Sequence, residues 1–159
     1  MKKVYFVTIF IVVAFFSIPN AHTTEIIPST LEYMTVFSDT IVVGTVSDKY
    51  SYWEGQKIFT NVGIDVEQFV KKSEDERSSY LQLKIPGGTV GDLSFHVDQG
   101  PEFKEGEKVM LFLKKINSDY FPYGLSYGVY RIYSDSATGQ EFINGPLFQS
   151  SQYYDLSTQ

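Results

Sequence analysis

The sequence has no cysteine, two histidines and a single tryptophan among its 159 residues. The lack of cysteine excludes disulfide bonds, thiolate zinc sites, a cysteine nucleophile and a lipid-modified N-terminal cysteine. A domain built from this chain must be held together by its hydrophobic core alone. A core of that kind is feasible at this length, because such a domain buries roughly two-thirds of its extended surface.

Basic residues are also scarce. The chain has 13 Lys and Arg against 19 Asp and Glu, which gives a net charge of −6. Proteins that bind nucleic acid neutralise backbone phosphates with Lys and Arg. We therefore do not expect nucleic acid among the partners of this protein.

Long apolar runs are absent except at the N-terminus. Val4–Ile18 is almost wholly apolar, follows Lys2 and Lys3, and is followed closely by the small residue Ala21. This order is typical of a secretory signal peptide, and the run is shorter than the roughly 20 residues that span a bilayer. We predict a signal peptide at residues 1–21, cleaved after Ala21, with no membrane span after its removal. Cleavage two or three residues later and an uncleaved N-terminal anchor are the alternatives.

Aromatic residues are plentiful, with 12 Tyr and 13 Phe. Aromatic and β-branched side chains suit half-buried strands, and residues 57–67 alternate between apolar and polar types as a strand requires. The chain favours strands at residues 41–46, 57–67, 81–85, 92–98, 107–113, 125–133 and 141–143. Glu54-Gly55-Gln56 predicts a turn between the first two. In the strand at 92–98 we expect Leu93, Phe95 and Val97 to point inward. Gly44 in the first strand predicts a bend or a close backbone approach.

A short helix is expected at residues 30–37. Ser29-Thr30-Leu31-Glu32 has the form of a capping box, and Leu31, Met34 and Phe37 have the spacing of an apolar stripe. With six to seven strands and one helix, the chain predicts a mainly β fold, an antiparallel OB-like β-barrel with one short N-terminal helix. This domain would occupy residues 29–146 and precede a polar tail at residues 147–159.

Two glycine-containing motifs carry a resemblance. Pro86-Gly87-Gly88-x-x-Gly91 is followed by Pro101-x-Phe103-x-x-Gly106-Glu107. This order resembles a loosely defined family of small exported bacterial and archaeal domains. The strand layout is also similar to the OB-like barrel of netrin-like modules and tissue inhibitors of metalloproteinases, whose inhibitory N-terminal cysteine this chain lacks. The resemblance implies a fold and an exported location, and it brings no catalytic residue or cofactor.

Reactive side chains do not converge in the sequence. Asp92, His96 and Asp98 share one face of a predicted strand, but alternate strand residues lie about 6.6 Å apart, so the first two would be separated by about 13 Å. One metal ion does not bridge that distance. We therefore expect no catalytic site, no metal and no cofactor, and a location in the periplasm, cell envelope or medium.

Two aromatic groups remain as candidates for binding. They are Tyr50, Tyr52 and Trp53 after the first strand, and Tyr120, Phe121, Tyr123 and Tyr127 around the sixth. The more common role of such residues is to cap barrel ends and fill the core; the alternative is an exposed platform for sugars, peptides or a partner protein.

These observations favour a non-enzymatic binding module whose ligand is an envelope or extracellular protein or a glycan. One alternative is a protease inhibitor that acts through the loop Gly100–Gly106. A second is a hydrolase in which His96 meets two carboxylates.

Overall fold

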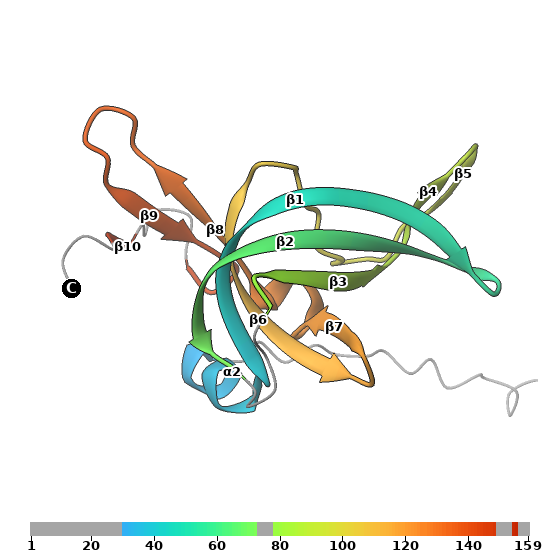
Figure 1. The fold of residues 1–159 in the computed structure, drawn as a ribbon, viewed down its shortest axis with the longest axis horizontal. Coiled ribbons are helices and arrows are strands. Elements are labelled where there is room, and N and C mark those ends of the chain that lie inside the picture. Colours follow the sequence, from blue (N-terminus) through green and yellow to red (C-terminus); the bar gives the residue numbers. More distant parts are fainter. Residues whose placement is uncertain (1–29, 73–77, 149–153, 156–159) are drawn as a thin grey trace, which may run out of the picture.

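The computed structural model describes residues 30–72, 78–148 and 154–155. The predicted signal peptide, Ser29 and most of the predicted tail lie outside these residues. The described part is mainly β, with one α-helix, α2 (Leu31–Phe37), and a 3-10 turn, η1 (Leu125–Gly128). Its ten strands (Figure 1) are β1 (Thr40–Glu54), β2 (Lys57–Lys71), β3 (Tyr80–Pro86), β4 (Gly88–Val90), β5 (Leu93–Phe95), β6 (Lys108–Ile116), β7 (Asp119–Pro122), β8 (Val129–Ser134), β9 (Glu141–Asn144) and β10 (Tyr154–Asp155).

Five strands pair in a closed circuit. β1 pairs with β2, β2 with β3, β3 with β7, β7 with β6, and β6 pairs back with β1. All of these pairings are antiparallel except β3–β7, which is parallel at Leu83 and Tyr120. An antiparallel arrangement throughout was expected, and this pairing corrects it. The reason is the odd number of strands: strands that alternate in direction around a circuit of five must meet once in the same direction.

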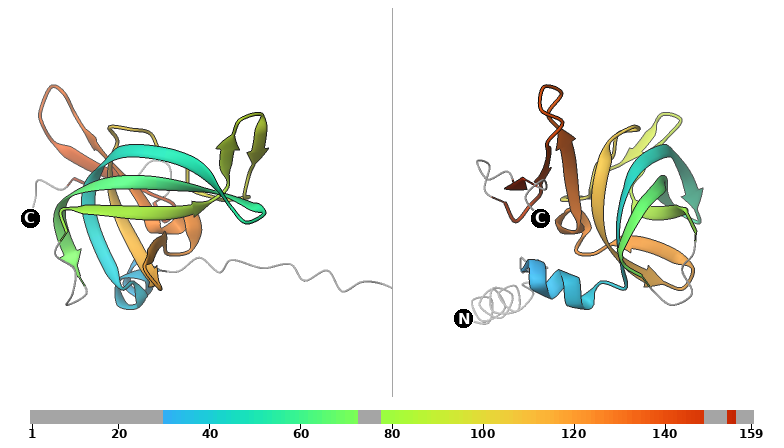
Figure 2. Two further views of the ribbon diagram at one scale, coloured as in Figure 1. Left: turned by 45° about the vertical axis from the view of Figure 1, so that its right-hand side comes forward. Right: turned by 60° about the vertical axis from the view of Figure 1, so that its left-hand side comes forward.

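The remaining strands extend this circuit or stand apart from it. β6 also pairs with β8, which continues the sheet through β9 to β10. β4 and β5 pair only with each other and form a hairpin that projects away from the circuit (Figure 2). No helix in the described residues is long and apolar enough to cross a bilayer.

Gly44 lies where β1 curves against β2. A Cβ atom at this position would overlap the carbonyl oxygen of Asp65 and lie 2.9 Å from Cγ2 of Ile64. The pairing of β1 with β2 shifts register beside this glycine, between Val43 and Gly44. Such irregularities increase the bend of a strand. The close backbone approach predicted from the sequence is therefore confirmed.

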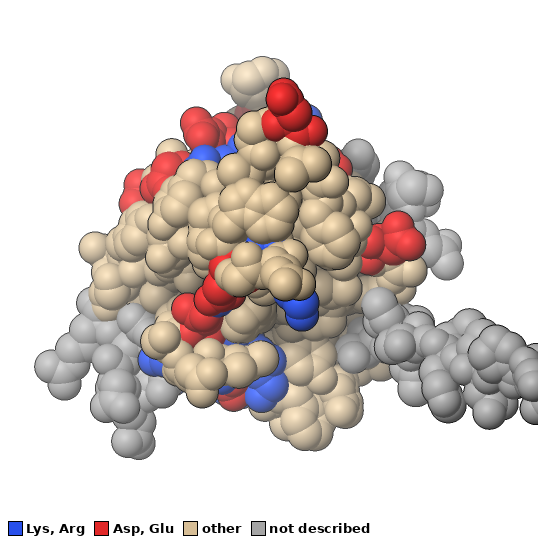
Figure 3. Space-filling view, turned by 90° about the vertical axis from the view of Figure 1, so that its right-hand side faces the viewer, with Lys and Arg blue, Asp and Glu red and all other residues tan. Residues whose placement is uncertain are grey.

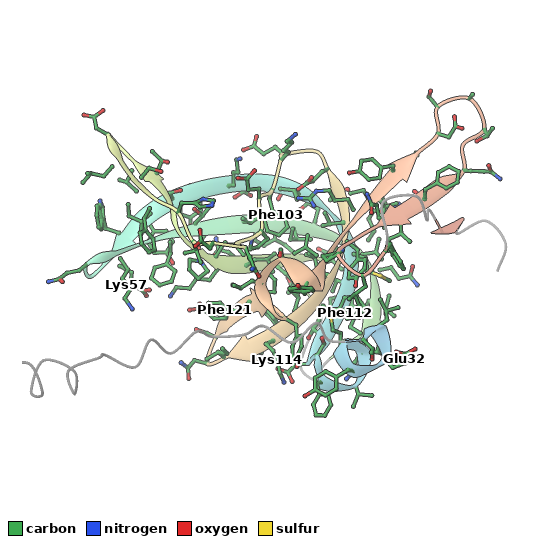
Figure 4. All side chains as sticks on the ribbon, turned by 180° about the vertical axis from the view of Figure 1, so that it is seen from behind. Glu32, Lys57, Phe103, Phe112, Lys114 and Phe121 are labelled. Carbon is green, nitrogen blue, oxygen red and sulfur yellow. The ribbon has the colours of Figure 1, made fainter. Side chains whose placement is uncertain are left out.

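Two clusters of buried side chains form the core. The first lies inside the circuit and includes Val42, Val62, Leu83, Leu111 and Phe103. The second lies between α2 and the outer side of the sheet, and its buried members are Met34, Ile41, Phe112, Tyr130, Ile132 and Ile143. In Figure 4, Phe112 lies next to α2, whereas Phe103 lies farther from it, toward β1 and β2.

Helix α2 differs in detail from its prediction. The side chain of Thr30 accepts a hydrogen bond of 3.2 Å from the backbone nitrogen of Tyr33, so Thr30 is the N-cap. Only Met34 of the predicted apolar stripe is buried, while Leu31 and Phe37 are exposed. At 3.6 residues per turn, these three side chains spread over an arc of about 120°, and only the central one, Met34, points into the core.

The predicted strand at residues 92–98 is wrong in extent and orientation. β5 ends at Phe95, and Leu93 and Phe95 are exposed rather than inward. The cause is the partner strand: β5 pairs with residues 88–90 in an isolated hairpin, so no core covers either of its faces. Residues 125–133 also begin with a 3-10 turn instead of a strand, and the four-residue β7 was not predicted.

Candidate functional site

A cleft of about 670 Å³ opens between the β4–β5 hairpin, the loop of residues 97–104 and the central parts of β1 and β2. Its lining includes four serine and threonine side chains, namely Ser51, Thr60, Thr89 and Ser94. Clefts of this size are typical of small-molecule and oligomer binding sites. We therefore treat this cleft as the candidate binding site.

The floor of the cleft is a directed chain of hydrogen bonds. The Thr60 hydroxyl donates to the carbonyl oxygen of Gly87 at 2.8 Å, so its proton is not available to Ser51. Ser51 Oγ, 2.8 Å from Thr60 Oγ1, must therefore donate to it. The backbone nitrogen of Thr89 in turn donates to Ser51 Oγ at 3.3 Å. This chain fixes the base of the hairpin to β1 and β2.

Gly88 is required at this point. Its φ of 133° lies in a region that favours glycine. A Cβ atom there would also overlap Ser51 Oγ and Thr60 Oγ1. The second glycine of the Pro-Gly-Gly motif thus lets the hairpin backbone lie directly on the two hydroxyls.

The opposite wall of the cleft is tethered at two carbonyl groups. Lys49 Nζ donates to the carbonyl oxygen of Phe103 at 2.9 Å, and Arg131 Nη2 donates to that of Glu102 at 2.6 Å. The Phe103 ring is buried in the first core cluster. A wall held by two cations and a buried ring gives the cleft a fixed shape before any ligand enters.

Aromatic rings continue from the cleft onto the outer side of the sheet. The ring centroids of Tyr50 and Tyr52 are 6.0 Å apart, and those of Tyr52 and Phe59 are 6.4 Å apart. We call these three residues the aromatic ledge. Tyr50 belongs to the ledge and is also among the residues that line the cleft, so the two features meet at this residue. Side chains alternate along β1, so the rings of the ledge lie on the opposite face of the strand from Ser51. Burial raises the pKa of the Tyr52 hydroxyl, which keeps that group neutral.

Polar side chains hold the ledge in place. The Tyr50 hydroxyl accepts hydrogen bonds from Asn61 Nδ2 at 2.9 Å and from Gln82 Nε2 at 3.2 Å. Lys84 Nζ lies 4.8 Å from the centre of the Phe59 ring. Its hydrogen bonds to Glu54 and Asp119 raise the pKa of Lys84, so the ammonium remains charged beside the ledge.

The predicted aromatic residues do not form one surface. Tyr50 and Tyr52 are together, but Trp53 follows them on the strand and therefore points to the other face. Tyr120 is buried in the first core cluster, and Tyr123 and Tyr127 pack against the second. The second predicted group thus contributes mainly to the core.

Phe59, Ser51 and Thr60 were not among the predicted site residues. The predicted turn at residues 54–56 was sufficient to find them, because strands joined by a tight turn place residues equally distant from it opposite each other. Tyr52 pairs with Phe59 in this way, and Ser51 pairs with Thr60.

Few of the side chains that line the cleft could act as catalytic acids, bases or nucleophiles. His96 lines it, and Glu102 is the one carboxylate among the lining residues. Asp92 and Asp98, which were considered from the sequence together with His96 as ligands of one metal ion, do not line the cleft. Within the described ranges, no three His, Asp or Glu side chains gather closely enough to hold a metal ion.

Comparisons with protein-family models, with curated proteins and with solved structures gave no match. The chemistry of the site itself must therefore indicate the ligand. Figure 3 shows that most of the surface at the end of the molecule that carries the β4–β5 hairpin is uncharged, with acidic and basic groups interspersed near its centre and acidic groups at its margin. A neutral ligand matches such a surface.

Proposed function

We propose that this chain is an exported, non-enzymatic binding module and that its ligand is an uncharged oligosaccharide of the envelope or the medium. The observation that carries the proposal is that Tyr50 belongs both to the lining of the cleft and to the aromatic ledge. A hydroxyl-lined cleft bordered by flat rings fits a ligand that presents both hydroxyl and C–H groups.

The circuit of five strands supports an OB-like barrel, the fold that we propose for the domain. Barrels of this type bind oligonucleotides and oligosaccharides on the face of their second and third strands. Part of the ledge and its supporting polar side chains lie on β2 and β3. The net charge of −6 disfavours polyanions, so the saccharide is the better of these two ligand classes.

The polar groups of the site also suit a saccharide. Hydroxyls both donate and accept hydrogen bonds. Ser51 and Thr89 already donate to Thr60 and Ser94, so they offer acceptor lone pairs to a ligand, and Ser94 offers its own proton from the other side of the cleft. Aromatic rings contribute large apolar contact areas with little loss of side-chain entropy. The tethered wall means that little ordering is needed on binding, which favours affinity.

Isothermal titration of the purified chain with a panel of neutral oligosaccharides tests the proposal. Tyr50→Ala is expected to weaken binding about tenfold or more, the usual effect of truncating a central aromatic residue. Tyr133→Ala is the matched control, since this tyrosine on β8 is similarly exposed but is not among the residues that line the cleft. Failure of every neutral saccharide to bind the unaltered chain would contradict the proposal.

The alternative of protease inhibition through residues 100–106 is supported less well. A protease must reach the backbone of an inhibitory loop, but here the carbonyl groups of Glu102 and Phe103 already accept hydrogen bonds from Arg131 and Lys49. Screening the purified chain at micromolar concentration against metallo- and serine proteases separates this alternative from saccharide binding. The hydrolase alternative would need a second carboxylate beside His96 and Glu102.

A further inference from the structure

The outward side of α2 carries apolar side chains that remain largely exposed, although the centre of the Tyr33 ring lies 6.4 Å from that of Tyr123. Tyr33, Val36 and Phe37 are 46%, 67% and 47% exposed. With 3.6 residues per turn, these three positions fall within one arc of about 100°, next to the direction in which Met34 enters the second core cluster. The rings of Tyr33 and Phe37 are 4.2 Å apart. We call these three residues the α2 apolar face.

Lysines surround this face. Lys71 Nζ donates to the carbonyl oxygens of Thr35 and Val36 at 3.0 and 2.9 Å, and Lys114 Nζ lies 3.0 Å from Asp39 Oδ1. Figure 4 shows Lys114 and Glu32 on either side of the helix. Positions 71, 72, 114 and 115 are all lysines, and the acidic residues Glu74, Asp75 and Glu76 follow Lys72 in the chain.

In the uncleaved alternative, only a short segment separates the apolar run from α2. The apolar run ends at Ile18, and 11 residues separate it from Thr30, the N-cap of α2. Eleven extended residues span at most about 40 Å. While the apolar run lies in a bilayer, the surface of that bilayer is therefore within reach of α2 at a high effective concentration.

We propose that the α2 apolar face rests on the phospholipid surface into which the N-terminal run inserts. Tyr33, Val36 and Phe37 enter the boundary between headgroups and acyl chains, where amphipathic helices bind. The neighbouring lysines face the lipid phosphates, as long basic side chains do at membrane surfaces. This contact is the role of α2 in the uncleaved chain, and it does not depend on the identity of the ligand in the cleft.

The orientation that follows leaves the cleft accessible. The β4–β5 hairpin, which borders the cleft, points away from α2 in each view of the ribbon (Figures 1 and 2). A domain that lies on the membrane through α2 therefore turns its cleft toward the surrounding medium.

The lack of cysteine gives a direct experiment. The full, uncleaved chain is reconstituted in vesicles of phosphatidylcholine and phosphatidylglycerol, with one environment-sensitive fluorophore on a single introduced cysteine. Val36→Cys reports on the α2 apolar face, and Leu93→Cys, at an equally exposed apolar position on β5, is the matched control. We expect a blue shift and quenching by spin-labelled lipid at position 36 and neither at position 93. Adding Tyr33→Ser to Val36→Cys should lower the docked-to-undocked ratio about fivefold, because less apolar surface enters the lipid.

Three results would overturn the proposal. Equal quenching at positions 36 and 93 would mean that the domain has no fixed orientation on the membrane. A blue shift at position 36 without vesicles that increases with protein concentration would assign the face to a second copy of the chain. The same shift without vesicles and independent of concentration would mean that another segment of the same chain covers it.

Discussion

Ser51 Oγ and Thr60 Oγ1 lie 2.8 Å apart across the β1–β2 pair, at the point where the β4–β5 hairpin meets the sheet. The contact joins two strands that are adjacent in the chain to a hairpin that follows only after β3. Because Thr60 donates onward to the carbonyl oxygen of Gly87, the pair is the central link in a longer hydrogen-bonded chain.

Replacing Thr60 with valine removes the hydroxyl and keeps the shape of the side chain. The Ser51 hydroxyl and the Gly87 carbonyl each lose a partner, so we expect the free energy of unfolding to fall by about 1–2 kcal/mol. Urea denaturation measures the change. Thr89→Val is the control, because its exposed hydroxyl bonds only to Ser94 in the hairpin and its loss should cost less than about 0.5 kcal/mol. Equal stability of the two variants would contradict a stabilising role for this chain of hydrogen bonds.

Gly44→Ala should destabilise the fold for a steric reason. The added methyl group would overlap the backbone of β2 at Asp65, which has no flexible group to move aside. We expect a loss of about 1–3 kcal/mol in thermal or chemical unfolding. Ser47→Ala, at an exposed position on the same strand, should have little effect. An unchanged stability of Gly44→Ala would show that β1 and β2 are not in such close contact.

Tyr130→Phe is expected to leave the protein as stable as before or to stabilise it. The side chain is fully buried, and its hydroxyl has no hydrogen-bond partner among the described residues. Burial raises the pKa of Tyr130 to about 12. Removing a buried polar group without a partner recovers its desolvation penalty, about 1 kcal/mol or more. A loss of stability on this substitution would reveal a partner for the hydroxyl and would be measured in the same unfolding experiment.

Asp39 should make stability depend on pH. It accepts a hydrogen bond from the backbone nitrogen of Lys115 and lies beside the Lys114 ammonium, which together lower the pKa of its carboxyl group below 3.8. The pKa of Asp39 is lower in the folded state than in the unfolded state. The carboxylate therefore contributes its full share to the free energy of unfolding above the unfolded-state pKa, and this share is lost as the pH falls through the folded-state pKa.

The test compares the native chain with Asp39→Asn in urea at neutral pH and at about pH 2. Since the carboxylate is partly exposed and screened, the difference at neutral pH should be only about 0.5–1 kcal/mol. This difference in the free energy of unfolding should approach zero at about pH 2. A difference that stays constant with pH would mean that the asparagine acts through its shape and not through its charge.

The sequence predicted the elements that it encodes locally. The alternation in residues 57–67, the turn at residues 54–56 and the close approach at Gly44 all correspond to features of β1 and β2. These features depend on side-chain period and on the backbone of single residues, and both can be read from neighbouring positions. The mainly β class follows from them.

Features that depend on distant partners were beyond prediction. Residues 93–95 alternate like a core strand, but their partner is the short segment 88–90, so the same pattern lies on an exposed hairpin. β7 has only four residues and owes its place to β3 and β6. The cleft likewise arises from three segments that the sequence separates by up to about 50 positions, and its tether from Lys49 to Phe103 leaves no local pattern.

The measurement that tests the saccharide proposal most directly is a nuclear magnetic resonance titration of the isotope-labelled chain with neutral oligosaccharides. We expect the backbone amide signals of Ser51, Thr60 and Thr89 to shift together and to saturate with the same dissociation constant. Signals from the β8–β9 hairpin should stay in place. Shifts confined to residues outside the cleft and the aromatic ledge, or no saturable shift with any neutral saccharide, would contradict the account.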